Sequence, residues 1–437
     1  SSDTMIFKAD ALYEDVDAVF FDANGDGSAD LYVVSGGNEY RDGNVNLADR
    51  LYINDGKARL PARMTRSEGN DAVGQGNFRK APDALPAFLK NKSCVSVADI
   101  DNDGDPDVFS GTLADPLIFG IPQTSRLLIN NGKGTFANAG NTIINLDSIG
   151  IVTSSFFADI NNDGWKDLVV AGEWMPITIF MNNNGKFTKS VIPSSTGLWQ
   201  SIFVDDVNGD GNLDILAGNW GHNNKFWSGK DGPLKMYVSD FDGNKNADQI
   251  LTYTLNHIEY PFLAKDELER PMPVLKSRYL LYTEFAGRPV NEVFKGWLDN
   301  VVPLIAEQLG SVVCYGNGKG NFKMRELPAE LQLAPIFSFE KVKQSAKNKN
   351  RYIAGGNFFD VIPYEGRYDA QPLALFSANG DINLRYLSQS NLAAVKGQVR
   401  DLKWIQAQDG KMLMVARNNE PLIFLKYKNQ NYTEGYR

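Results

Sequence analysis

The sequence predicts an all-β protein, a seven-bladed β-propeller, and two recurring patterns carry this prediction. One is an aspartate-rich nonapeptide that stands between two β-type runs; the other is an apolar run, an Asn-Gly or Asp-Gly turn and a second short run. Two strands joined by a loop and followed by a hairpin make a four-stranded unit, which is the blade of a propeller. The chain has 437 residues, and closed all-β architectures can hold that length as one domain.

The nonapeptide occurs five times and follows D-x-[DN]-x-[DN]-G-x-x-D. Its copies, loops one to five in chain order, are Asp22–Asp30, Asp99–Asp107, Asp159–Asp167, Asp206–Asp214 and Asp240–Asp248. Runs rich in Val, Ile, Phe and Tyr precede and follow the copies, so each copy is expected to join two strands.

Counting these units predicts one domain over residues 1–437, with blades that start near residues 16, 94, 152, 200, 234, 336 and 399. The hairpins are RLYINDGKARL, RLLINNGKGTF, TIFMNNNGKFTKS and VVCYGNGKGNFKMREL, of which the last is assigned to the fifth blade. The sixth and seventh blades lack the nonapeptide, and KVKQSAKNKNR fills its place in the sixth. The seventh lacks a strand, which MIFKA at residues 5–9 is expected to supply so that no sheet edge stays open.

Two segments do not fit the blade pattern. Residues 61–93 are rich in Pro, Asn, Gly and Ser and are expected to form a long excursion within the first blade. Residues 256–307 have helix-like spacing of apolar residues and are expected to form a largely helical insertion within the fifth blade.

The nonapeptide has the oxygen ligands that calcium prefers. Calcium takes six to eight oxygens, and side chains at positions 1, 3, 5 and 9 with the position 7 carbonyl supply them. Glycine at position 6 allows a positive φ. We therefore expect four to five calcium ions, held by Asp22, Asn24, Asp26, Ser28, Asp30, Asp99, Asp101, Asp103, Asp105, Asp107, Asp159, Asn161, Asp163, Trp165, Asp167, Asp206, Asn208, Asp210, Asn212, Asp214, Asp240, Asp242, Asn244, Asn246 and Asp248.

Two other interpretations of the nonapeptide fit the sequence less well. A simple turn needs the Asp-Gly pair but not an aspartate at both position 1 and position 9, which all five copies have. An EF-hand needs glutamate at position 12, where this chain has Val33, Ser110, Val170, Ala217 and Leu251. Loop two, with four carboxylates, is expected to bind most tightly. Loop five is expected to be the weakest because Lys245 replaces the glycine.

Composition excludes several classes of function. The net charge is -9, and no stripe of Lys and Arg interleaved with aromatics suggests a nucleic-acid surface. No apolar run approaches the roughly 20 residues that span a bilayer. His222 and His257 are the only histidines, which leaves little room for zinc or nucleophile sites. Cys94 and Cys314, assigned to the second and fifth blades, are expected to be buried without bridging.

The motifs resemble those of FG-GAP/VCBS repeat proteins, whose relatives include the integrin α-chain propellers. DAVFFDANGDGSADLYVVSGGNEY, GEWMPITIFMNNNGKF, GNWGHNNKF and the DFDGNKNADQILTY segment resemble the ASPIC/UnbV-associated VCBS-repeat proteins of Bacteroidota. The resemblance implies an exported protein, often a surface lipoprotein encoded near SusC/SusD-type nutrient importers. Ser1, Ser2 and Asp3 do not form a basic-then-apolar leader, so an export signal is expected to be removed or to lie upstream.

We expect a non-enzymatic binding module at the cell surface, outer membrane or outside the cell rather than in the periplasm. Its partner is a protein or glycan, or a membrane-associated complex, on the face opposite the nonapeptides, where loops between second and third strands vary. Candidate ligand residues there are Trp174, Trp220, His222, Phe358 and Arg367. The alternative is a lectin or polysaccharide-degrading enzyme, with Glu173 and Asp360 as paired acids. The sequence leaves open the partner, the oligomeric state and any upstream domain or lipid anchor.

Overall fold

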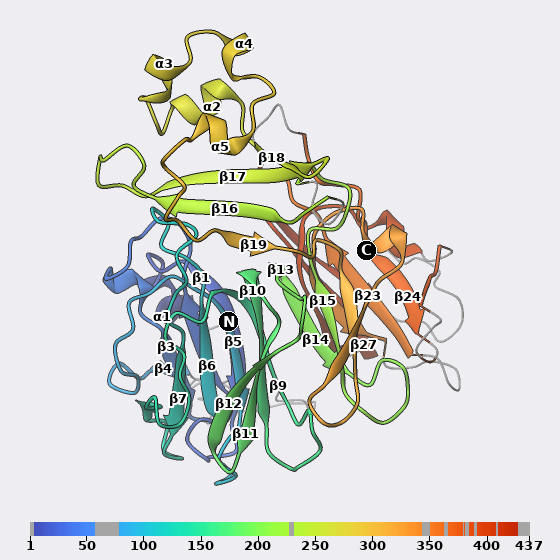
Figure 1. Ribbon diagram of the computed structural model, residues 1–437. Helices are drawn as coiled ribbons and strands as arrows, with labels where there is room; N and C mark the ends of the chain where they lie inside the picture. The colour runs from blue at the N-terminus through green and yellow to red at the C-terminus, as the bar shows by residue number, and fades with distance from the viewer. Residues whose placement is uncertain are drawn as a thin grey trace. The chain divides into compact units, whose positions relative to one another are not determined.

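The computed structural model describes residues 4–56, 78–226, 231–342, 350–361, 366–378, 380, 384–388, 391–407 and 410–426. The chain divides into two compact units, which are described separately. The first comprises Ser1–Phe157, Gly164–Leu168 and Phe180–Lys189, and the second comprises Ala158–Asp163, Val169–Ile179 and Ser190–Arg437. Across the described residues the strands form seven sheets (Figure 1), which confirms the expected all-β class.

The first unit contains two four-stranded sheets whose strand order follows the chain. The strands are β1 (Asp15–Phe21), β2 (Asp30–Ser35), β3 (Arg50–Asn54) and β4 (Phe78–Lys80), then β5 (Lys92–Ala98), β6 (Asp107–Thr112), β7 (Arg126–Asn130) and β8 (Phe136–Asn138). Tyr32 and Val34 of one sheet share a buried cluster with Val108 and Leu128 of the other. Alternating apolar residues on β2 and β6 therefore bury one face between the two sheets.

Two expectations for the first unit differ from the structure. The fourth strand, β4, pairs with β3 at residues 78–80 rather than directly after the Asn-Asp-Gly turn. Residues 57–77, which include the first half of the expected excursion, lie outside the described residues. MIFKA does not form a closing strand but part of the helix α1 (Thr4–Ala9). The Phe7 ring lies 5.2 Å from that of Tyr52 and 6.3 Å from that of Phe78, so this turn of helix is stabilised by packing on the first sheet.

The third sheet contains five strands, and the division between the two units passes through it. Its strands are β9 (Ile151–Ala158), β10 (Asp167–Met175), β11 (Thr178–Asn183), β12 (Lys186–Val191) and β13 (Gly197–Leu198). The order is β12-β11-β10-β13, and β9 pairs with β10.

The fourth sheet corrects the assignment of one hairpin. It consists of β14 (Ser201–Asp205), β15 (Asp214–Gly218), β20 (Val312–Gly316) and β21 (Phe322–Glu326), with Ile215 paired to Cys314. The hairpin that was assigned to the fifth blade therefore belongs to the same sheet as loop four. Each short apolar strand fits many partners, so the repeat pattern alone does not fix which strand it joins. Residues 219–311 form one long connection within this sheet.

That connection carries a sheet of its own and four short helices. The strands are β16 (Leu234–Ser239), β17 (Asp248–Leu255), β18 (Ile258–Pro261) and β19 (Leu304–Ala306), in the order β18-β17-β16-β19. The helices, α2 (Lys265–Glu269), α3 (Leu275–Arg278), α4 (Tyr282–Phe285) and α5 (Val290–Val293), lie in residues 262–303, the helical segment, on one side of this sheet (Figure 1). The expected helices are present, but in an inserted sheet that does not follow the blade order.

The last two sheets complete the second unit. They contain β22 (Ile336–Lys341), β23 (Asn350–Gly356), β24 (Ala374–Ala378) and β25 (Arg385–Tyr386), then β26 (Val399–Ala407), β27 (Gly410–Arg417) and β28 (Glu420–Lys426). Within the described residues the last sheet has three strands, as expected. Val313 of the fourth sheet shares a buried cluster with Ile336 and Phe376, and Ile353 shares another with Leu402. Residues 343–349, in the place of the nonapeptide, lie outside the described residues.

Candidate functional site

The first aspartate of the nonapeptide folds the loop around its own carboxylate. In loop four the Asp206 carboxylate accepts hydrogen bonds from the backbone N–H groups of Gly209, Asp210 and Gly211, at 2.7, 3.0 and 3.0 Å. The Asp22 and Asp240 carboxylates accept the same three bonds in loops one and five. Because a carboxylate bonded to several N–H groups is fixed in position, the loop backbone is ordered around one carboxylate.

The last aspartate, at position 9, is buried and fastens the loop to a neighbouring strand. In loop two the Asp107 carboxylate accepts from the Ile100 N–H at 3.0 Å and from the Asn130 N–H at 2.8 Å. In loop four Asp214 accepts from the N–H groups of Val207 and Gly316 in the same way. Position 9 was predicted as a cation ligand, and the structure shows that its carboxylate also holds the third strand of the sheet.

Two positions of the loop have left-handed backbone. Position 6 has φ between +70° and +95° in all five loops, including Lys245 at +70°, which agrees with the expectation for that position. Position 4 is left-handed too, a feature that the sequence analysis did not predict. Its five residues are all glycine or asparagine, the types that tolerate this conformation best, so that restriction was the signal: Gly25, Asn102, Asn162, Gly209 and Gly243.

The donor sets of loops two and five fit a hard cation. In each loop one oxygen from every one of three carboxylates lies within 4.8 Å of the others: Asp99, Asp101 and Asp107 in loop two, and Asp240, Asp242 and Asp248 in loop five. Asp99 Oδ1 is buried and has no hydrogen-bond partner. Burial, together with the Asp101 and Asp103 charges, raises the pKa of Asp107 to about 7, although the hydrogen bonds from the Asn130 and Ile100 N–H groups oppose the shift. A divalent cation would neutralise these charges and supply the partner that Asp99 lacks.

Loops one, three and four have asparagine at position 3, and its amide bonds the position 5 carboxylate. The Nδ2 to Oδ2 distances are 3.1 Å for Asn24 to Asp26, 2.8 Å for Asn161 to Asp163 and 2.9 Å for Asn208 to Asp210. In these loops the amide donor thus occupies an oxygen that a cation would use. Loop three is divided between the two units. In its second-unit part Asp159 accepts from the Asp163 N–H at 3.0 Å.

The hairpin asparagines have a role that the sequence analysis missed. The Asn130 side-chain amide donates to the Pro106 carbonyl of loop two and, at 3.0 Å, to the Ala23 carbonyl of loop one. The Asn182 amide donates to Ile100 of loop two at 2.7 Å. Each of these residues therefore joins its hairpin to position 2 of the loop in the sheet before its own. Both asparagines begin a run of asparagines that ends at the turn glycine, and this was the available signal.

Among the ligand candidates, Trp220 and Phe358 come together. The Trp220 ring lies 5.4 Å from Phe358, 5.1 Å from Phe226 and 5.6 Å from Tyr368. The indole N–H of Trp220 is buried without a hydrogen-bond partner. With three rings around it, Trp220 contributes packing between connections of different sheets.

Trp174 sits at a bulge in β10. Glu173 pairs with Leu198 and Met175 with Gly197, so Trp174 is the extra residue, with a φ of +59°. This conformation is rare for a bulky residue and marks local strain. Burial raises the pKa of Glu173, and a hydrogen bond from Gln200 Nε2 at 2.8 Å opposes that shift.

The remaining two candidates, His222 and Arg367, are exposed. His222 Nε2 is 3.2 Å from Glu326 Oε2, and the Arg367 guanidinium lies 5.1 Å from the Phe359 ring centroid. Asp360, proposed with Glu173 as an acid pair, accepts from the Asn418 side chain at 3.4 Å, whereas Glu173 is bonded to Gln200. No contact between the two carboxyl groups is described.

An exposed apolar segment and a buried ionic cluster were both missed. Leu117 is 53% exposed, and Ile118, Phe119 and Ile121 beside it are 36–41% exposed, in the connection from β6 to β7. The presence of four large apolar residues in such a short stretch could have indicated this segment from the sequence. Their exposure makes this connection a candidate contact surface.

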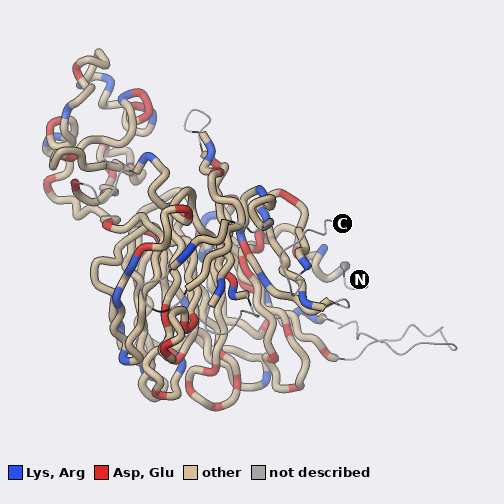
Figure 2. Tube along the Cα trace, turned by 90° about the vertical axis from the view of Figure 1, so that its right-hand side faces the viewer, with Lys and Arg blue, Asp and Glu red and all other residues tan. Residues whose placement is uncertain are grey.

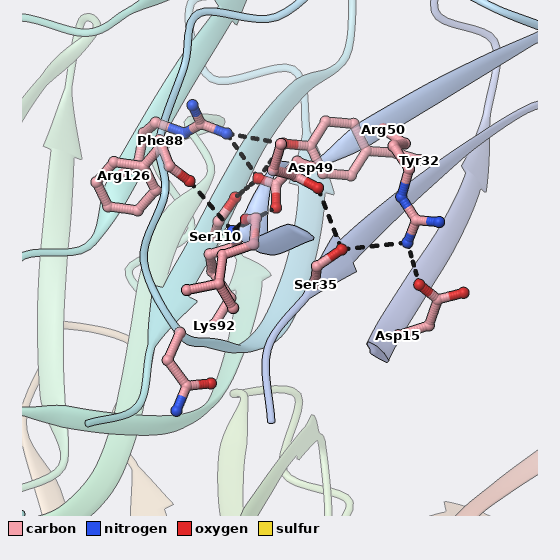
Figure 3. A network of polar contacts seen from close by, with 12 residues as sticks. Asp15, Tyr32, Ser35, Asp49, Arg50, Phe88, Lys92, Ser110 and Arg126 are labelled. Carbon is pink, nitrogen blue, oxygen red and sulfur yellow. Dashed lines mark hydrogen bonds and ion pairs between the residues drawn. The ribbon is translucent and has the colours of Figure 1, made fainter. Parts of the chain in front are cut away.

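The ionic cluster is formed by charged residues at the starts of β3, β5 and β7 (Figure 3). Arg126 donates to Asp49 Oδ2 at 2.6 Å, and Lys92 Nζ lies 3.0 Å from Asp49 Oδ1. The Tyr32 hydroxyl also donates to Asp49, at 2.8 Å. Desolvation by burial lowers the pKa of Lys92, although Asp49 opposes the shift. Asp49 lies directly before β3, whereas Lys92 begins β5 and Arg126 begins β7, so their spacing in the sequence gave no sign that they would meet.

Comparison with known proteins identifies two repeats. The FG-GAP-like repeat family matches residues 113–170 and 159–217, which contain loops three and four. No curated protein matches. A similar solved structure is the crystal structure of BBS1N in complex with ARL6DN, soaked with mercury, with 10% identity and a TM-score of 0.35, covering 96% of this chain and 94% of that one. Among the described residues, no helix is long and apolar enough to cross a membrane. Cys94 and Cys314 are both buried and free, as expected.

Proposed function

We propose that this chain is a calcium-stabilised β-propeller that acts as a non-enzymatic binding module for a protein partner outside the cytoplasm. The observation that carries the proposal is a difference between the two ends of the strands within each unit. At one end the loops repeat the same hydrogen bonds; at the other the connections differ, and one of them exposes Leu117, Ile118 and Phe119. Variable connections on a rigid scaffold are where recognition concentrates.

The ring of blades would hold six sheets rather than the expected seven. Val313 of the fourth sheet packs with Ile336 and Phe376 of the β22–β25 sheet, and the Ser201 hydroxyl donates to the Ile336 carbonyl at 3.0 Å. This direct packing leaves no place between them for the sheet β16–β19, which we infer to be an insertion outside the ring. The seven-blade count had included it.

The proposed binding of calcium by the loops supports the proposed location outside the cytoplasm. Loops of this kind are suited to the millimolar calcium found outside cells. The resemblance to exported VCBS-repeat proteins points to the cell surface or outer membrane, where the chain would serve as an accessory subunit or adhesion platform. Loop two, with four carboxylates, is proposed to hold its ion most tightly.

A binding experiment tests the proposed face. Purified wild-type protein and the double variant Leu117→Asp, Ile118→Asp are immobilised with calcium and exposed to solubilised surface proteins of the source cell. Leu12→Asp, a substitution of another exposed leucine (70%) in the first unit, is the matched control. We expect the wild type and the control to retain the same partner and the double variant to lose it.

The same experiment also tests the alternative function. A glycan array is probed in parallel, because the alternative is a carbohydrate-binding or polysaccharide-degrading protein. Specific glycan retention by the wild type, with no protein partner, would favour that alternative. Retention of the same partner by all three proteins would show that the β6–β7 connection is not the contact surface.

A further inference from the structure

Loop five differs from the other loops in what its second residue contacts. Position 2 is Ala23, Ile100, Ile160 or Val207 in loops one to four, and each of these aliphatic residues is buried. In loop five it is Phe241, whose ring stacks on Trp297 of the helical segment, with centroids 6.2 Å apart and planes at 10°. Loop five is thus in direct contact with the helical segment.

The contact begins at a carboxylate of the candidate cation site. The Phe241 N–H donates to Asp248 Oδ2 at 3.1 Å. Asp248 is the buried member of the trio with Asp240 and Asp242, and burial together with those two charges raises its pKa. A cation held by this trio would neutralise Asp248 and hold the backbone of the residue that supports Trp297.

Trp297 in turn holds the helices. Its ring lies 5.9 Å from that of Phe294, and the Arg278 guanidinium at the end of α3 lies 4.9 Å from its centroid. Arg278 also donates to the Val293 carbonyl of α5 at 3.2 Å. The contacts therefore run from the loop through Phe241 and Trp297 to two helices.

The helical segment depends on such support because its helices are very short. α2 to α5 have four or five residues each, far below the length at which isolated helices are stable in water. Their order comes from a cluster of Leu268, Met272 and Val293 with Tyr237 and Ile250 of the inserted sheet. Tyr237 lies in β16 and Ile250 lies in β17, and these are the two strands that loop five joins.

The segment presents an apolar surface just beyond Arg278. Leu280 is 78% exposed, Leu281 is 61% exposed and Tyr282 is 56% exposed. Acidic and basic residues are mixed along the segment (Figure 2), whereas residues 280–282 carry no charged side chain.

We propose that loop five is a calcium-responsive support that sets the order of the helical segment, and with it the presentation of Leu280, Leu281 and Tyr282. The inference rests on the proposed calcium function and assigns loop five a different role from the other loops. Lys245 at position 6 has a φ of +70°, a conformation that strains lysine but not the glycine of the other loops. The site therefore releases its ion at calcium concentrations that keep loop two filled.

The test compares two identical substitutions at the same loop position. Asp242→Asn in loop five and Asp101→Asn in loop two are prepared in the full chain, with Trp297→Leu as a third variant. Hydrogen exchange of peptides from residues 262–303 is followed by mass spectrometry as calcium is titrated, and bound calcium is counted by calorimetry. In the wild type, calcium is expected to slow exchange in these peptides.

For Asp242→Asn the midpoint of that protection should move to about tenfold higher calcium, because one ligand charge is lost, whereas Asp101→Asn should leave it in place. The Trp297→Leu variant should still bind calcium in loop five, but calcium should no longer slow hydrogen exchange in residues 262–303. The inference is overturned if calcium binds and exchange in residues 262–303 does not change, or if both aspartate variants shift the midpoint equally. Absence of calcium binding in the wild type would instead overturn the proposed function.

Discussion

The side-chain amide of Asn130 donates a hydrogen bond to the Ala23 carbonyl, 3.0 Å away, and so joins the hairpin of the second sheet to loop one. The same amide donates to Pro106, and the Asn130 backbone N–H donates to Asp107. One residue thus connects two sheets and both of their loops.

Removing this link should destabilise the protein. Asn130→Ala leaves the buried carbonyl of Ala23 without a donor, and we expect a loss of about 1–3 kcal/mol in the free energy of unfolding, measured by urea denaturation with calcium present. Asn138→Ala, at an exposed asparagine of β8, should change it by less than about 0.5 kcal/mol. Equal effects of the two substitutions would show that the link contributes nothing.

Neutralising Asp49 should lower the free energy of unfolding by more than Asn130→Ala does. Asp49→Asn leaves Lys92 and Arg126, whose side chains are 0% and 4% exposed, without their shared counter-charge. Breaking a buried pair in this way typically costs about 3–5 kcal/mol. Asp83→Asn, at an exposed position, is the control in the same denaturation experiment. A loss below about 1 kcal/mol for Asp49→Asn would mean that water replaces the carboxylate.

The raised pKa of Glu173 predicts that the stability of the folded protein depends on pH. Because burial raises its pKa in the folded state, the folded protein binds this proton more tightly than the unfolded chain, and stability falls as pH rises through the window between the two pKa values. Glu173→Gln should be as stable as the wild type near about pH 4 and more stable near neutral pH. Glu330→Gln, at an exposed glutamate, should show no such difference. A Glu173→Gln variant that is less stable at both pH values would contradict the assignment.

The aspartates should not contribute equally to calcium stabilisation. Asp103→Ala removes a carboxylate from the loop with four, whereas Asp248→Ala affects the loop with Lys245. We expect Asp103→Ala to lower the melting temperature in saturating calcium by more than Asp248→Ala. The reverse order in calorimetry would show that loop five carries more of the stability than loop two.

Local features of the loops were predictable from the sequence because they depend on neighbouring residues. The left-handed position 6 follows from glycine at that place, and Lys245 adopts it as well. The pairing of β15 with β20 was not predictable, since the two strands are separated by an inserted sheet and either could pair with several apolar strands. α1 was mistaken for a strand because a five-residue apolar run fits both structures.

In the candidate site, too, local contacts were predictable from the sequence and long-range contacts were not. The acidic trio of loop two lies within a single nonapeptide, so its spacing predicted it. The bond from Asn182 to Ile100 and the ion pairs of Asp49 with Lys92 and Arg126 join residues far apart in the chain. Such contacts depend on how the sheets pack, which the repeat pattern does not specify.

Calcium removal tests the central claim most directly. The protein is purified in calcium, its metal content is measured by mass spectrometry, and its melting temperature is compared before and after chelation and after calcium is restored. Four to five calcium ions per chain are expected, with a fall of many degrees on chelation and recovery on restoring calcium, because a ligand that binds the folded state alone stabilises it. A chain that contains no metal and melts at the same temperature with and without the chelator would contradict the account.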